Sequence, residues 1–332
     1  MGTASTTAFF DVHPANASGV RWMIVPATTG QLMMNGHMQL EHARTLRRMH
    51  HGQSPLLLPN AWDAGSARLF VQRGFAAVAT TSGGVAWSLG YQDGEQVPLD
   101  EVLAAVARMA RVCSVPLSVD FEGGYGATPA AVGTSVRAVI EAGAAGVNIE
   151  DGTPGHGPLR PLDEAAARIA AARDAATASG VALVINARVD LWLHEVPLAD
   201  ASARMDEGLR RARAYLAAGA DCIYPIGLRD RVELASLVKA LGAPVNVAAG
   251  PGVPPLGELA RLGVARVSTA TRFATLALGA VDQAVAELRS SGRFDGLAPA
   301  FTHAHAQALY TPCCRNPVVV HPCQRSRTCK SA

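Results

Sequence analysis

The sequence predicts an α/β protein whose parallel strands close into a (β/α)8 barrel of the TIM type. Between residues 55 and 291, short apolar segments alternate with Ala-rich stretches of helical period, and this unit occurs eight times. Such alternation is typical of a parallel sheet, and eight units fill about 250 residues when the sheet closes. The predicted strands are 55–60, 76–81, 116–121, 145–150, 182–188, 221–226, 244–249 and 264–269.

The stretches between these strands carry the end signals of helices. Residues 99–112 and 162–179 have acidic residues in the first turn and Arg later, as the helix dipole favours. Glycines precede several strands, in EAGAAGV, AAGADCI and RLGVARV, where a left-handed residue ends a helix. An open, doubly wound sheet is the alternative. The first predicted strand leads into NAWDAGS rather than a GxGxxG phosphate turn, which favours the barrel.

Composition argues against several classes of protein. Hydrophobic residues make up 49% of the 332 residues, charged residues 17%, and the formal net charge is +2. We therefore expect neither disorder nor a nucleic-acid partner. Apolar runs fall short of the roughly 18 residues that a membrane helix needs. The first 37 residues lack the pattern of a secretory signal, so a cytoplasmic location is predicted.

We expect three segments along the chain. Residues 1–37 are predicted to be a disordered or non-native extension, because the first amphipathic helical pattern begins at Met38. Residues 38–299 are predicted to form the catalytic barrel. Residues 300–332 are predicted to be an irregular Cys-rich tail. Four of the six cysteines lie there without paired CxxC motifs, so a zinc site is not expected.

Charged residues follow the predicted strands at the end where such barrels assemble their active sites. Asp120 and Glu122 follow one strand, Glu150 ends the next, and Arg188 ends the one after. Mg²⁺ prefers carboxylate oxygens and water, which makes the three acidic residues candidate metal ligands. The planar guanidinium of Arg188 suits a substrate carboxylate. Salt bridges to loop residues are the alternative for each residue alone, and their convergence favours a site.

The second predicted strand leads into a glycine turn. Ser82 and Gly83 bring backbone N–H groups close to a ligand there, and Asp93 follows in the same loop. A tight turn without a ligand is the alternative. Trp62 and Trp87 are expected in the pocket wall or the core.

These segments carry a resemblance. The sequence resembles the isocitrate lyase / phosphoenolpyruvate mutase superfamily over residues 38–290, most specifically in LSVDFEGGYG and GAAGVNIED, with INARVD and AGADCIYPIG in the same order. The resemblance implies a Mg²⁺-dependent barrel acting on α-keto or α-hydroxy acids through an enolpyruvate-like species. Members make or break a C–C bond, or a C–P bond in the mutases. It also implies a homo-oligomer, a dimer or tetramer, that swaps the last helix, supplied here by residues 271–291.

The resemblance also implies roles for the acidic residues. Asp120 matches the principal metal carboxylate, with Mn²⁺ as an alternative to Mg²⁺. Glu122 and Glu150 would hold the metal mostly through water. Asp93 matches an acid that supports the metal site or contacts the transferred group.

The resemblance implies substrate contacts as well. Ser82 and Gly83 match backbone donors to the substrate's carboxylate and oxyanion, and Arg188 matches the arginine that grips the substrate. The expected catalytic residues are Asp93, Glu150 and Arg188.

Other positions depart from the family. The loop 151–163 lacks the Lys and Cys of the lyases and the Lys and Asn of the phosphonomutases. The chain's two lysines, Lys239 and Lys330, lie elsewhere, which argues against a Schiff-base aldolase. Ile226 stands about where better-known members present Glu or His.

These departures favour a decarboxylase or lyase that acts on a small oxaloacetate-like or substituted malate-like acid. Loss of CO₂ from a β-keto acid mainly requires stabilisation of the oxyanion. A C–P bond enzyme, with His156 or Arg160 replacing the missing groups, is the alternative within the family. A non-catalytic barrel that binds keto acids is the alternative from another class. Asp120→Ala separates the two classes, since an enzyme should lose turnover and a binder only affinity.

Overall fold

The computed structural model describes residues 29–155, 157–193, 200–298 and 301–311. The chain divides into two units, Met1–His37 and Met38–Ala332, and the barrel belongs to the second. No helix among the described residues is both long and apolar enough to cross a membrane. The expected extension over 1–28 and the cysteines of the tail lie outside the described residues.

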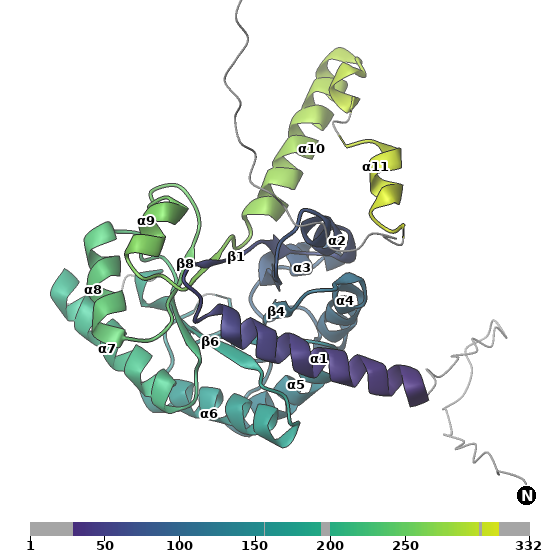
Figure 1. The fold of residues 1–332 in the computed structure, drawn as a ribbon. Coiled ribbons are helices and arrows are strands. Elements are labelled where there is room, and N and C mark those ends of the chain that lie inside the picture. Colours follow the sequence, from purple (N-terminus) through teal and green to yellow (C-terminus); the bar gives the residue numbers. More distant parts are fainter. Residues whose placement is uncertain (1–28, 156, 194–199, 299–300, 312–332) are drawn as a thin grey trace, which may run out of the picture. The chain divides into compact units, whose positions relative to one another are not determined.

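The strands form parallel pairs that close into a ring (Figure 1). One sheet has the order β2 (Asn60–Ala61), β3 (Val78–Thr80), β4 (Leu117–Asp120), β5 (Gly146–Glu150), β6 (Val184–Val189) and β7 (Cys222–Pro225). The other has the order β1 (Leu56–Leu58), β9 (Arg266–Ser268) and β8 (Asn246–Ala248).

Two connections join these sheets. β1 and β2 are parts of one extended segment on either side of Pro59. A parallel bridge between Ile223 and Val245 links β7 to the segment that leads into β8. Each of the predicted strand segments contains or overlaps one of these strands, and the predicted (β/α)8 barrel is confirmed.

Burial explains why these segments form strands. Every residue of β5 and β6 is buried. Strands covered on both faces are the rule in parallel sheets, because helices pack on the outside and side chains fill the inside. Inward positions alternate with outward ones, so Asn148 and Glu150 of β5 share a face. That alternation decides which polar side chains can reach the site.

Helices connect the strands in the order that the sequence predicts. Gly143, Gly219 and Gly263, which precede β5, β7 and β9, have φ of 109°, 103° and 83°, the left-handed conformation expected of them. The helices after the strands are α2 (Ala64–Gln72), α3 (Ser82–Leu89), α4 (Leu99–Val112), α5 (Pro129–Glu141), α6 (Leu162–Ala178), α7 (Ala201–Ala217), α8 (Arg231–Leu241), α9 (Leu256–Arg261) and α10 (Arg272–Ser291), with short 3₁₀ turns at Asp190–Trp192 and Asp295–Leu297.

Helices also lie near both ends of the described chain. Helix α1 (Thr29–Met49) begins before Met38. Part of the segment expected to be irregular forms helix α11 (His303–Ala308), which Thr302 caps by accepting a hydrogen bond from the His305 N–H. The carbonyl of Leu309 accepts hydrogen bonds from Arg68 and Gln72 of α2. Capping and docking on α2 therefore order this part of the tail.

Helix α10 leaves the barrel after β9 and extends away from it (Figure 1). Ala274 is its buried residue among those described, whereas Leu276, Leu278, Val281 and Val285 are exposed. The helix thus presents exposed apolar side chains that the described residues of this chain do not cover.

Candidate active site

A cavity of about 300 Å³ lies at the carboxyl ends of the strands. Its wall includes Ser82, Asp93, Asp120, Arg188 and Ile226. The remaining described lining residues are Asn60, Thr81, Trp87, Asn148, Leu193, Tyr224, Ser268, Ala270 and Thr271.

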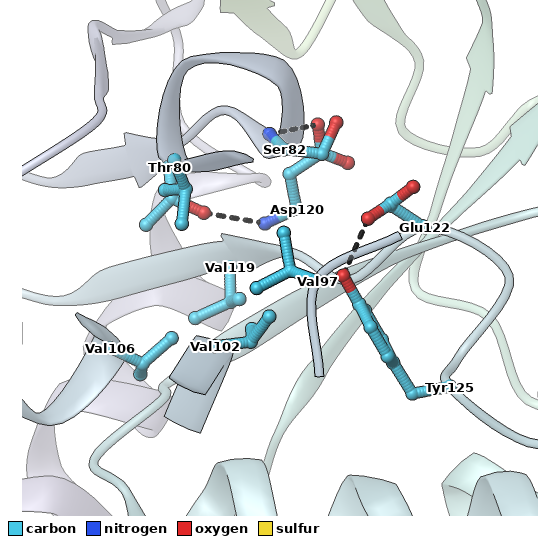
Figure 2. A pocket seen from close by; sticks show the side chains of 10 residues that line it. Thr80, Ser82, Val97, Val102, Val106, Val119, Asp120, Glu122 and Tyr125 are labelled. Carbon is cyan, nitrogen blue, oxygen red and sulfur yellow. Dashed lines mark hydrogen bonds between the residues drawn. The ribbon is translucent and has the colours of Figure 1, made fainter. Parts of the chain in front are cut away.

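Asp120 ends β4, and three hydrogen bonds fix it, of which Figure 2 shows those with Thr80 and Ser82. Its backbone N–H donates to Thr80 Oγ1 over 2.9 Å, and the Ser82 N–H donates to Asp120 Oδ2 over 3.2 Å. Asn148 Nδ2 donates to Asp120 Oδ1 over 3.3 Å. A carboxylate has about four lone-pair sites, so each oxygen keeps capacity for a cation. The side chain is held in place without being saturated.

Glu122 lies in the turn after β4 with φ of 47°, in the left-handed region. Tyr125 Oη donates to Glu122 Oε1 over 2.6 Å (Figure 2), and the Glu95 N–H donates to Oε2. Burial raises the pKa of Glu122 to about 7, with Asp93 and Asp120 adding to the rise and the Tyr125 hydrogen bond opposing it. A divalent cation nearby would favour the ionised form.

A smaller cavity of about 10 Å³ lies between these two acids. Thr80, Ser82, Asp120, Glu122 and Tyr125 supply its polar atoms, and five valines supply its apolar wall (Figure 2). That volume has room for about one water molecule.

Glu150 and Arg188 form a buried ion pair with Asp190. Arg188 Nη1 lies 2.5 Å from Glu150 Oε2, while Nε and Nη2 donate to the two Asp190 oxygens over 2.7 Å each. Burial alone would lower the pKa of Arg188, but the two carboxylates outweigh it and raise that pKa well above its usual value. Burial also raises the pKa of Glu150, against the opposing charge of Arg188. Arg188 is therefore a cation held rigidly at the cavity wall.

A second buried group supports this pair. The Asp190 N–H donates to Asp151 Oδ1 over 2.8 Å. Asp151 Oδ2 accepts from Tyr215 Oη over 2.7 Å and from Arg211 Nη1 over 3.1 Å. Helix α7 thereby holds the end of β6, which carries Arg188.

The glycine turn becomes the first turn of α3. Thr81 at its N-cap makes no side-chain capping bond. A Cβ on Gly83 would lie 3.0 Å from Asp93 Oδ2 and 3.2 Å from the Trp87 ring, so both side chains would have to shift slightly to admit a larger residue. The N-terminus of a helix attracts anions through its N–H groups and dipole.

The structure brings together most, but not all, of the residues that the sequence singles out. Glu122 lines the smaller cavity, and Glu150 reaches the larger one through Arg188. Of the two tryptophans expected in the pocket wall or the core, Trp87 lines the larger cavity, and Trp62 is absent from the described lining of both cavities. Arg160 is buried against Glu164, away from the cavity wall, and His156 lies outside the described residues.

The sequence interpretation missed Asn148, which touches Asp120. Its signal was its position two residues before Glu150, on the same face of β5. It also missed the wall formed by Leu193 and Tyr224, which carries no such signal.

The spacing of the acidic side chains limits how many of them can contact one metal ion directly. Among the described residues, no three His, Cys, Asp or Glu side chains lie close enough to hold a metal ion between them. Mg²⁺ commonly binds through one or two carboxylates, with water and substrate oxygens completing its shell. The arrangement around Asp120 fits that mode better than a cage of three carboxylates.

The fold and the site define a (β/α)8 barrel with an acidic, donor-rich pocket at the carboxyl ends of its strands. The Phosphoenolpyruvate phosphomutase family matches residues 46–289 of the sequence. The chain belongs to this family and is an enzyme of the lyase and mutase type found in the isocitrate lyase / phosphoenolpyruvate mutase superfamily.

Several proteins with named activities are similar to this chain. The chain is 34% identical to 2-methylisocitrate lyase of Escherichia coli (strain K12) over 201 residues, 58% of this chain and 64% of that protein. It is 31% identical to oxaloacetate decarboxylase of Rhodopseudomonas palustris (strain TIE-1) over 264 residues, 76% of this chain and 85% of that protein. The crystal structure of a 2,3-dimethylmalate lyase superposes with a TM-score of 0.71 at 26% identity, covering 81% of this chain and 94% of that one.

Proposed function

We propose that this protein is a Mg²⁺-dependent decarboxylase or lyase of small 2-oxo acids, with an oxaloacetate-like acid as the preferred class of substrate. The main support for this proposal is the contrast between the polar and the apolar residues that line its cavity. Asp120 and the N-terminus of α3 give the lining a charge and backbone donors, whereas Leu193 and Ile226 in the same lining are apolar. The polar residues suit a substrate oxygen that gains negative charge during the reaction, and the apolar residues suit a carboxylate that loses its charge.

The residues around Asp120 fit a divalent cation. Asp120 would contact the metal, and Glu122 and Glu150 would act through water. Burial raises the pKa of Glu122 and of Glu150, and a cation held at Asp120 would favour the ionised form of both. When bound, Mg²⁺ would act as a Lewis acid toward the substrate's keto oxygen.

The chain's own residues would orient the substrate. The N–H groups of Gly83 and Gly84 at the start of α3 would donate hydrogen bonds to the substrate's 1-carboxylate, because no side chain caps that turn. Arg188, fixed by Glu150 and Asp190, would hold an oxygen at the cavity wall. This pre-organisation avoids reorganisation as charge moves.

The apolar lining residues would favour loss of CO₂. Among the described lining residues Arg188 is the cation, and it already pairs with two carboxylates. A β-carboxylate facing Leu193 and Ile226 would lack a counter-charge. As CO₂ leaves, the electron pair of the breaking C–C bond forms the enolate. Negative charge then develops on the keto oxygen, where donors are available. Water would then protonate the enolate to give pyruvate.

A substrate panel tests this proposal. Purified protein with Mg²⁺ would be given oxaloacetate, 2-methylisocitrate, 2,3-dimethylmalate and phosphonopyruvate, and pyruvate would be measured in a coupled assay. We expect the fastest release from oxaloacetate. Release from 2-methylisocitrate or dimethylmalate alone would favour hydroxy-acid cleavage, and release from phosphonopyruvate alone would favour C–P chemistry. Binding without turnover of any of them would identify a binding barrel.

A further inference from the structure

Arg266 crosses the interior of the barrel. It begins β9, and its side chain is completely buried. Nη2 donates to Ser118 Oγ on β4 and to Asn148 Oδ1 on β5, each over 3.3 Å. β4 and β5 lie across the ring from β9, so the guanidinium spans the barrel beneath the cavity.

The charge of Arg266 has no carboxylate in contact among the described residues. No salt bridge in the described parts of the chain includes it, and Nε and Nη1 meet no acceptor there. Burial lowers its pKa, while Cys222, Tyr224 and Asp120 act to raise it. An arginine begins so high that it stays protonated at neutral pH. Burying such a charge lowers the stability of the folded protein. The dipoles that Arg266 orients nearby are therefore where its role is to be sought.

Asn148 connects this charge to Asp120. Its Oδ1 accepts hydrogen bonds from Arg266 Nη2 and from Asn186 Nδ2, the latter over 2.8 Å. Two donors at one end of the amide fix which end is oxygen. The Nδ2 end therefore points to Asp120 Oδ1. Rotation of the amide by half a turn would place its NH₂ group against both donors.

We propose that Arg266 is a positioning residue for Asp120 and acts through the amide of Asn148. The buried cation and Asn186 hold the amide oxygen, so the amide N–H holds Asp120 Oδ1. The Ser82 N–H holds Oδ2, and together these bonds set the plane of the carboxylate. The inference rests on the proposed function, in which Asp120 contacts the divalent cation.

The test measures Mn²⁺ affinity of the full-length protein by electron paramagnetic resonance, without substrate. Arg266→Met removes the charge with an apolar side chain of similar length, a replacement that buried charges often tolerate. Groups that orient a metal ligand typically affect metal affinity by about tenfold or more, and we expect that loss here. Arg266→Lys, which keeps the charge, should retain more affinity than Arg266→Met.

Two further variants separate positioning from general damage. Ser118→Ala removes the other acceptor of the same Nη2 and should leave Mn²⁺ affinity within about twofold, since the path to Asp120 is intact. Asn148→Ala should lose affinity as Arg266→Met does, and the double variant should lose no more than either single one. Urea unfolding of each protein provides the measure of stability.

Each result bears on the inference. Wild-type affinity in Arg266→Met, or in Asn148→Ala if Arg266→Met does not fold, overturns it. Losses that add in the double variant, or an equal loss in Ser118→Ala, overturn it as well. If the wild-type protein binds no Mn²⁺, the proposed function fails and the inference fails with it. If the wild type binds and only the variant pattern is wrong, the inference alone fails.

Discussion

At the scale of residues, the site depends on carboxylates that are held by neutral donors instead of by cations. Asp120 is bonded to Ser82 and Asn148, and Glu122 to Tyr125 and Glu95. Neutral donors orient a carboxylate without cancelling its charge. The acids therefore keep their attraction for a cation, which Glu150, paired with Arg188, partly gives up.

Ile226→Arg tests the role of the apolar residues that line the cavity. A cation there would pair with the substrate's second carboxylate in the ground state, and this charge would be lost as CO₂ leaves. We expect KM for oxaloacetate to fall and kcat to fall too, each by about tenfold for a change near 1.4 kcal/mol. Steady-state kinetics measure both, and Ile226→Leu is the matched control. A higher kcat in the arginine variant would contradict the proposed role.

His50 predicts a component of acid sensitivity. It is buried, its Nδ1 contacts the Leu46 carbonyl over 2.8 Å, and burial lowers its pKa to about 3, with the charge of Arg266 adding to this. In the unfolded chain the His50 imidazole binds a proton near pH 6.5, whereas in the folded protein it binds one only near pH 3. Stability is thus complete above about pH 6.5 and falls as the pH falls toward 3.

His50→Gln checks this sign. The free energy of unfolding in urea, measured between about pH 7 and pH 4, should fall less steeply in the variant. His51→Gln, a change at the exposed neighbour, serves as the control and should keep the wild-type slope. Equal slopes in wild type and His50→Gln would show that His50 is not the titrating group.

At the scale of elements, helix starts position the loops of the site. Thr128 caps α5 by accepting a hydrogen bond from the Ala131 N–H, and Pro129 occupies the first turn. The segment just before this cap carries Glu122 and Tyr125. The cap therefore fixes where that segment ends.

Thr128→Ala should lower the free energy of unfolding by about 1 kcal/mol, the usual cost of a lost N-cap. Thr134→Ala, in the middle of the same helix, should cost little, because its hydroxyl bonds to the Ala130 carbonyl, which the helix already uses. Chemical denaturation measures both changes. A larger loss in Thr134→Ala would mean that the cap does not govern α5.

The elements also show how far sequence can reach. Strand positions followed from apolar runs and glycine stops, and Asp120, Glu150 and Arg188 could be placed because parallel strands end on one rim. Period-2 alternation tells which side chains point inward, but not which of them meet across the ring. The bonds from Arg266 to β4 and β5 depend on that closure. So does the wall of Leu193 and Tyr224, and no local pattern encodes either.

At the scale of the whole molecule, the exposed apolar side chains of α10 predict self-association. Leu276 and Val281 are 68% and 61% exposed, and the described residues of the chain offer them no cover. Exposed apolar side chains gathered on one helix indicate an interaction surface. We propose a second copy of the chain as the partner, in a homo-oligomer that covers α10.

Light scattering coupled to size-exclusion chromatography tests this assembly. The wild type should elute as a dimer or tetramer, and the double variant Leu276→Glu/Val281→Glu should shift to a smaller species, because two buried charges without partners oppose association. Asp282→Glu, on the same helix, is the control. A monomeric wild type would contradict the proposed assembly.

The central claim is that Asp120 binds the divalent cation on which turnover depends. The most direct measurement is pyruvate release from oxaloacetate by wild type and Asp120→Ala, each titrated with Mg²⁺ after treatment with EDTA, and corrected for the reaction in buffer with Mg²⁺ alone. We predict saturable, Mg²⁺-dependent release by the wild type and a loss of at least about a hundredfold in the variant. Equal release by both proteins, or release unaffected by EDTA, would contradict the account.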